Sequence, residues 1–415
     1  MEKQRSYTFS IFVIGSLFFV FGFVTWLNAI LIPFLKTACE LTDFQSSFVT
    51  FAFYISYFVM SIPSSFVLKK TGFSNGMALG LIIMAIGSIL FVPAALNRNY
   101  VIFLTGLFIQ GLGLSLLQTA SNPYATILGP IESAARRISI MGICNKIAGM
   151  IGILILSSVL FSGTEELMSS IPTMQNPAER EAALQLLSNK VILPYIIMTM
   201  ILIGLVLFIK AARLPEIDDD DTEHHGEKRK SIFAYPYLWL GVIAIFFYVG
   251  AEVISIDYLV RYGEYQGFSS ALSSKFPVFA LIALVVGYLL GIIAIPKFVS
   301  QRRALIVQLF LAIALVFVIL FTNGLVSVIA VIGLSFAHAI MWPAIWPLSI
   351  HDLGRHTKLG SALLVMAIAG GAVIPLIYTS LSEHFNPQAA YALLFVSYAY
   401  ILFFATAGYK IVKKS

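Results

Sequence analysis

The sequence predicts an all-α membrane protein with twelve transmembrane helices in two pseudo-symmetric six-helix bundles. Of its 415 residues, 59% are hydrophobic and 11% are charged, and the mean hydropathy is +0.92, which excludes a water-soluble globule of this size. Apolar runs of the roughly 20 residues that cross a bilayer recur along the whole chain. Residues 113–123 (GLSLLQTASNP) and 333–343 (GLSFAHAIMWP) begin alike and both end on proline. This repeat indicates two copied halves with a substrate site between them near the middle of the membrane.

The predicted spans fall into two groups of six, on either side of the longest charged stretch. They are 9–35, 44–68, 76–96, 101–128, 138–162 and 190–212, then 236–261, 275–296, 303–322, 325–350, 358–382 and 387–410. The charged opening runs into the first apolar stretch without a small-residue cleavage site, so we interpret it as a retained helix and not a signal peptide. The charged stretch 214–231 is predicted to be a cytoplasmic linker between halves 1–213 and 232–415. We interpret His224 and His225 as part of this solvated linker and not as metal ligands.

Orientation follows from the basic residues, because Lys and Arg in short loops remain on the cytoplasmic side of a membrane. With the N-terminus inside, 19 of the 26 Lys and Arg residues fall on the cytoplasmic side and 6 on the opposite side, while Lys146 lies within a span. Both termini are therefore predicted to be cytoplasmic. The same bias explains the net charge of +6, so no nucleic-acid partner is needed.

No sequence motif indicates an enzyme, a metal site or a cofactor. HExxH, GxSxG and P-loop motifs do not occur, and the six histidines are scattered. Cys39 and Cys144 are too few and too differently placed for a disulfide framework or a metal cluster. We therefore expect no catalytic residue, no metal and no cofactor.

The six-plus-six arrangement, the long central loop and the basic loops 69–76 (KKTGFSNG) and 296–303 (PKFVSQRR) resemble the major facilitator superfamily. Four segments are more specific: 21–36 (FGFVTWLNAILIPFLK), 116–130 (LLQTASNPYATILGP), 138–152 (ISIMGICNKIAGMIG) and 341–354 (MWPAIWPLSIHDLG). They resemble the fucose:proton symporter family, on its glucose/galactose transporter branch, and the similarity runs over nearly the full chain. The resemblance implies a multi-pass sugar transporter of the bacterial inner membrane, most often coupled to protons. We expect a monomer, because each chain contains both halves.

Two departures from that family matter. Fucose permeases carry a carboxylate in the first-span motif and another in the fourth-span motif, and these are thought to serve sugar binding and proton coupling. Ala29 and Gln118 stand at those positions here. Neither side chain can release a proton near neutral pH, so the family's coupling pair is absent.

Ionisable residues within spans are the candidates for coupling, because a charge in a membrane is costly unless it is paired or hydrated. The seventh span contains Glu252 and Asp257, and the fifth contains Lys146. We predict that Glu252 carries the coupling proton and that Lys146 is its charge partner across the two halves, or is shared with Asp257. The alternative for Asp257 is simple solvation at the outer end of its helix.

Sugar sites combine hydrogen-bonding amides with an aromatic platform. The predicted substrate-binding residues are Asn28, Gln118, Asn122, Asn145, Tyr248, His338, Trp342 and Trp346. The last three recur every four residues in the tenth span and so share one helical face. The 220-residue repeat aligns His338 with Gln118 and Tyr248 with Asn28. Alternatively, the amides only join neighbouring helices.

The predicted function is import of a monosaccharide by cation symport, with alternating access between the two halves. The choice between glucose, galactose, fucose and an amino sugar stays open, as does the choice between proton symport, sodium symport and uniport. The rival is an exporter of drug-like or lipid compounds, which should have a greasy cavity. The converging amides favour a sugar.

Overall fold

The computed structural model describes residues 2–127, 134–161, 165–212, 231–295, 297–351, 353 and 356–411, and side chains within them except at 2–11, 122–127, 134–139, 165, 166, 169, 172, 357 and 358. The predicted linker, with His224 and His225, lies outside these residues apart from Ser231. The division into halves 1–213 and 232–415 therefore remains a prediction.

Helices account for almost the whole described chain, as an environment without water for the backbone requires. Before residue 213 they are α1 (Glu2–Trp26), α2 (Asn28–Ala38), α3 (Asp43–Ser46), α4 (Phe48–Ile89), α5 (Phe91–Leu96), α6 (Tyr100–Ile127), α7 (Ala134–Phe161), α8 (Glu165–Ser170), η2 (Ile171–Thr173), α9 (Pro177–Asn189) and α10 (Ile192–Ala212).

After residue 230 the helices are η3 (Ile232–Ala234), α11 (Pro236–Asp257), α12 (Leu259–Tyr265), α13 (Ser270–Ser273), α14 (Phe276–Ala294), α15 (Gln301–Phe321), α16 (Gly324–His338), α17 (Met341–Ile350), α18 (Thr357–Met366), η5 (Ala367–Ala369), α19 (Gly370–His384), η6 (Ala389–Ala392), α20 (Leu393–Thr406) and η7 (Gly408–Lys410).

The membrane-length helices agree with the twelve predicted spans. Among the described residues, 11 segments are long and apolar enough to cross a membrane, and the segment Asp43–Leu96, with 54 residues, contains two predicted spans. Gly72 divides it, with φ 73° and ψ 173° in place of helical values. A side chain rarely adopts that backbone conformation, so glycine is the residue that permits the second and third spans to be joined directly.

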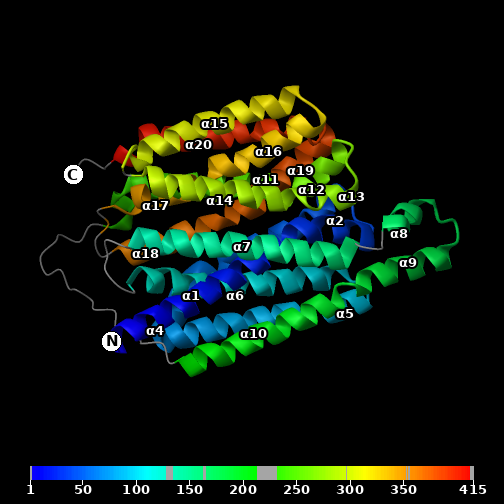
Figure 1. Cartoon of the computed structure of the whole chain (residues 1–415), viewed down its shortest axis with the longest axis horizontal. Helices are drawn as coiled ribbons and strands as arrows, with labels where there is room; N and C mark the ends of the chain where they lie inside the picture. The colour runs from blue at the N-terminus through cyan, green and yellow to red at the C-terminus, as the bar shows by residue number, and fades with distance from the viewer. Residues whose placement is uncertain are drawn as a thin grey trace, which may run out of the picture.

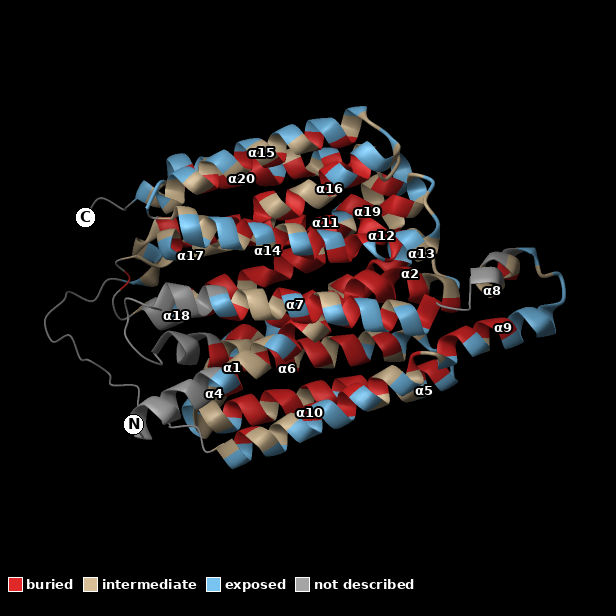
Figure 2. Cartoon of the chain, in the orientation of Figure 1, coloured by how far each residue is buried: buried red, intermediate tan, exposed pale blue. Residues whose placement is uncertain are grey.

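The two sets of helices lie side by side, with α1–α10 mostly in the lower part of Figure 1 and α11–α20 mostly in the upper part. Burial separates central from peripheral spans. In the most apolar part of the spans Phe12–Ala38 and Leu359–His384, 78% and 72% of the residues are buried. The corresponding share is only 28% in both Pro177–Ala212 and Gln301–Phe321. Figure 2 colours many residues of these peripheral helices as exposed, and the exposed residues include large apolar side chains such as Leu207 and Phe310. Since these side chains are apolar, lipid is their natural neighbour.

Several central spans are interrupted near mid-length. Leu27 separates α1 from α2, Ala339 and Ile340 separate α16 from α17, and η5 separates α18 from α19. Pro343 contributes to the second break, because it has no backbone N–H to bond to the carbonyl of Ala339. Interrupted spans in membrane transporters bring irregular backbone and polar groups to a site between the halves.

Gly72→Ala should strain the connection between the second and third spans, because Cβ disfavours a φ of 73°. We expect a loss of about 1–3 kcal/mol in unfolding free energy, seen as a lower melting temperature in detergent. Gly204→Ala is the matched control, since a Cβ there meets nothing within 4 Å. Equal stability of both variants would contradict the assignment of strain to Gly72.

Candidate functional site

The centre of the molecule contains an ion pair that joins the two sets of helices. Lys146 on α7 places Nζ 3.4 Å from Oε1 of Glu252 on α11, and each side chain is 10% exposed. The pair that the sequence predicts is therefore adjacent in space. The attraction between a buried carboxylate and ammonium offsets part of the desolvation cost of both charges, and loss of one charge leaves the other without that compensation. The coupling role of the pair stays a prediction.

Trp26, at the end of α1, also contacts Lys146. Lys146 Nζ lies 4.1 Å from the centre of the Trp26 ring, a cation–π contact. Nε1 of Trp26 donates to Oδ1 of Asn145 at 3.2 Å, and Nδ2 of Asn145 donates to the carbonyl of Phe18 at 3.4 Å. A Cβ at Gly149 would lie 2.3 Å from Cδ1 of Trp26, so glycine there admits the ring. Sequence reasoning missed Trp26, although it lies within one of the segments that carry the family resemblance.

His338 is the last residue of α16 and is fully buried. Oγ of Ser255 donates its proton to the carbonyl of Glu252 at 2.8 Å, so it accepts from Nδ1 of His338 at 3.3 Å. Nε2 of a neutral ring then accepts from Tyr398 Oη at 2.8 Å. Both ring nitrogens are thus bonded to protein groups, and Ser255 links the ring to the helix turn of Glu252. Sugar contact by His338 stays a prediction, and it would require one of these bonds to open.

Three of the rings predicted to contact the sugar lie close to one another. Trp342 and Trp346 stack with ring centres 5.2 Å apart, and Tyr248 lies 6.3 Å from Trp342. Tyr248 is one helical turn before Glu252 and interacts with it electrostatically. Both tryptophans are half-buried, which leaves part of each indole able to meet a ligand.

Two tyrosines, Tyr57 and Tyr54, connect Gln118 with the region around Glu252. Neither of them was identified from the sequence. Nε2 of Gln118 donates to Oη of Tyr57 at 3.0 Å. Tyr57 stacks with Tyr54, with ring centres 6.4 Å apart, and Tyr54 lies near Glu252 and Asp257. No pattern in the sequence pairs Gln118 with a tyrosine 61 residues away.

Asp257 and Asn28 are buried polar residues without full hydrogen bonding. Asp257 is 0% exposed, neither carboxylate oxygen has a hydrogen-bond partner among the described residues, and Glu252 and Lys146 both act on it electrostatically. Solvation at a helix end is therefore not its environment in this state. Nδ2 of Asn28 is likewise buried without a partner. The side chain of Asn122 lies outside the described residues.

A second set of contacts between the halves closes the end of the molecule opposite the termini. Asp43 and Arg261 form an ion pair with a distance of 2.9 Å between Oδ2 and Nη2. The backbone N–H of Phe44 donates to Oε1 of Glu383 at 2.7 Å. Ser47 donates to Thr379 at 2.7 Å, and Thr50 bonds to Tyr258 at 2.9 Å. Among the described residues, the polar contacts between the two sets of helices lie here or at the Lys146–Glu252 pair.

Comparison with known proteins agrees with this architecture. The family model described as Major Facilitator Superfamily matches residues 14–375. The chain belongs to the Major Facilitator Superfamily. The fold class and the family resemblance predicted above are therefore confirmed.

Superfamily members of similar sequence span almost the whole chain. A "Glucose/galactose transporter" of Brucella abortus is 32% identical over 412 residues, covering 99% of this chain and 96% of the relative. An "L-fucose-proton symporter" of Escherichia coli is 31% identical, covering 90% of this chain and 86% of the relative. The crystal structure of the superfamily transporter FucP in the outward conformation superimposes with a TM-score of 0.74 at 31% identity, covering 97% and 99% of the two chains.

The buried ion pair makes a prediction about stability. Lys146→Met leaves Glu252 without its cation, and we expect a loss of about 3–5 kcal/mol in unfolding free energy. The double variant K146M/E252Q should recover much of that loss, because no unpaired charge remains. Thermal unfolding in detergent measures both.

Lys36→Met is the control, because it removes an exposed ion pair with Asp43 and should cost no more than about 1 kcal/mol. If the effects of K146M and E252Q simply add in the double variant, the two side chains do not stabilise each other.

Proposed function

We propose that this Major Facilitator protein imports a monosaccharide together with a proton. Halves 1–213 and 232–415 would alternate access around the central site, with 214–231 as the linker. The observation that carries the proposal is the Lys146–Glu252 ion pair, which joins α7 to α11 beside an amide and three aromatic rings. Relatives of this length are named as sugar transporters and a sugar–proton symporter.

The proposed mechanism uses the cost of an unpaired buried charge. Protonation neutralises Glu252 and removes its attraction for Lys146, which lies 3.4 Å away. Lys146 and Asn145 can then contact sugar hydroxyls, while the indoles of Trp342 and Trp346 meet the apolar face of the ring. Without sugar, protonation of Glu252 removes the only carboxylate that forms an ion pair with Lys146 among the described residues. The protonated form without sugar is unfavourable, which limits proton leak.

The other residues predicted for sugar binding and coupling have additional roles in this proposal. Gln118 and Asn28 supply further hydrogen-bonding groups, and Asp257 is a second carboxylate within the field of the pair. Asn122 and His338 remain predicted sugar ligands. We place the protein in the bacterial inner membrane as a monomer with both termini in the cytoplasm, on the basis of its charge distribution.

Uptake into proteoliposomes tests the function. Labelled glucose, galactose, fucose and N-acetylglucosamine are compared with and without an inward proton gradient in sodium-free buffer. We expect one of them to accumulate only with the gradient. Equilibration without accumulation would point to a uniporter or a sodium-coupled carrier, and no uptake of any sugar would favour an exporter.

The same assay tests Glu252. Glu252→Gln should abolish accumulation but retain exchange of labelled for unlabelled sugar, because Gln can hydrogen-bond but cannot carry the proton. Glu179→Gln, at an exposed position on α9, is the matched control and should accumulate sugar normally. Full accumulation by E252Q would remove Glu252 from the coupling mechanism.

Trp342→Ala should weaken sugar binding by about 0.5–1.5 kcal/mol, up to roughly tenfold, with little effect on expression. Binding is measured by calorimetry in detergent. Trp239→Ala is the control, since its ring stacks on Phe233 at 5.3 Å, away from the ion pair. Equal losses of binding and folded protein in W342A would indicate a packing role only.

A further inference from the structure

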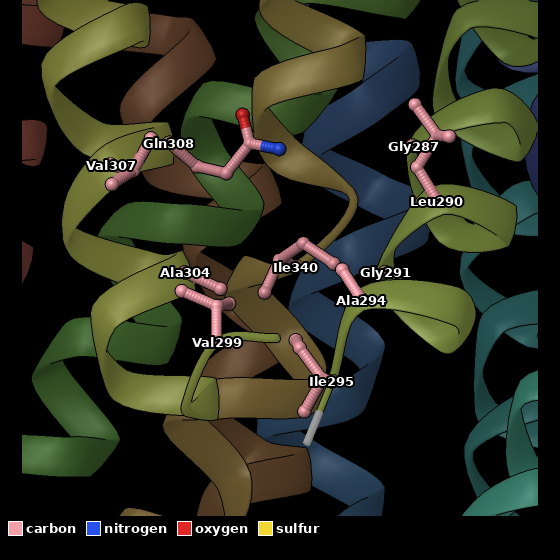
Figure 3. Close-up of a pocket in the computed structure, with 10 residues that line it drawn as sticks. All are labelled: Gly287, Leu290, Gly291, Ala294, Ile295, Val299, Ala304, Val307, Gln308 and Ile340. Carbon is pink, nitrogen blue, oxygen red and sulfur yellow. The ribbon is translucent and has the colours of Figure 1, made fainter. Parts of the chain in front are cut away.

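An apolar groove lies on the periphery of the second half, remote from the ion pair. It has a volume of about 180 Å³ and is lined by α14, α15, the loop between them and Ile340. Its walls include Leu290, Ala304 and Val307, and Figure 3 shows these side chains facing a common space between the helices. Val307 is 63% exposed and Leu290 is 50% exposed. Because both belong to membrane-length helices, the groove opens towards lipid.

One end of this groove carries a concentration of positive charge. Ile295 and Val299, which line the groove, flank Lys297, and Ala304 directly follows Arg303. Lys297 and Arg303 are exposed. Arg302 and Lys410 add two more charges around the ring of Tyr409, at 4.9 and 5.6 Å from its centre. No acidic residue occurs in 291–304 or 401–411, and these four side chains have no ion pair among the described residues.

The groove also contains one polar side chain. Gln308 makes no side-chain hydrogen bond with a described residue, and its Oε1 is buried. Its amide extends from α15 into the space between α15 and α14 (Figure 3). Gln308 is seven residues beyond the start of α15, about 10 Å along the helix. An unpartnered amide at that depth is costly in hydrocarbon unless a polar group of a neighbouring molecule meets it.

We propose that this groove is a binding site for an anionic phospholipid. The phosphate lies on Lys297 and Arg303 at the end that carries the chain termini, Gln308 bonds to an ester group, and an acyl chain fills the space beside Ala304 and Val307. Charge complementarity selects this occupant: the basic residues have no acidic partner among the described residues, and the cytoplasmic leaflet carries anionic headgroups. A wholly apolar ligand would leave the charges and the amide without partners.

Native mass spectrometry of the purified full-length protein tests the site, with phosphatidylglycerol and phosphatidylcholine of the same acyl chains added in turn. We expect phosphatidylglycerol to bind more tightly than phosphatidylcholine. The variant K297Q/R303Q should weaken phosphatidylglycerol binding about 30-fold, the loss expected for two basic residues near the headgroup. Ala304→Phe should weaken the binding of both lipids, because it fills the groove and leaves the charges in place.

The control is K69Q/K70Q, which removes two exposed basic residues at the predicted cytoplasmic end of the other half and should leave phosphatidylglycerol binding unchanged. Melting temperatures verify that each variant is folded, and Val307→Trp is a second groove-filling variant at an exposed position. The proposal is wrong if the two lipids bind equally, if K69Q/K70Q weakens binding as much as K297Q/R303Q, or if neither groove-filling variant has an effect.

Discussion

A charge inside a membrane must find a partner, and in this protein Lys146 and Glu252 meet that requirement across the interface of the two halves. Each side chain of the pair is only 10% exposed, so in the proposed mechanism separation of the halves requires another group to neutralise or solvate the charges. Trp26 holds the ammonium by its π face, and Ser255 ties His338 to the helix turn of Glu252. The surrounding contacts therefore position the two charges.

Polar contacts at the end opposite the termini also join the two sets of helices. Asp43–Arg261 and the hydroxyl contacts between Ser47 and Thr379 and between Thr50 and Tyr258 close the end opposite the termini. These are short, mostly hydroxyl-mediated bonds that individually contribute little net free energy. A closure built from several weak bonds can open without breaking a packed core. FucP, with the same fold, was crystallised in the outward conformation.

The peripheral spans differ from the central spans in how many of their residues are buried. The spans that end with α10 and that form α15 bury few residues and expose apolar side chains, because lipid replaces protein as their neighbour. Polar atoms on that surface are exceptions. Near one end of the groove, Lys297 and Arg303 have no ion pair among the described residues, and the amide of Gln308 within it has no hydrogen bond there.

The sequence by itself determined the fold class, the number of spans and the residues that carry charge within them. Those properties depend on composition and on apolar runs long enough to cross a bilayer, which are local. It also selected Lys146 and Glu252, because ionisable residues within spans are rare. Only the tertiary structure decided their neighbours: the ring of Trp26, the partner of Gln118, the burial of Asp257 and the closure at Asp43. Contacts between helices that are distant in the sequence depend on packing and side-chain direction, which hydrophobic periodicity in one chain does not encode.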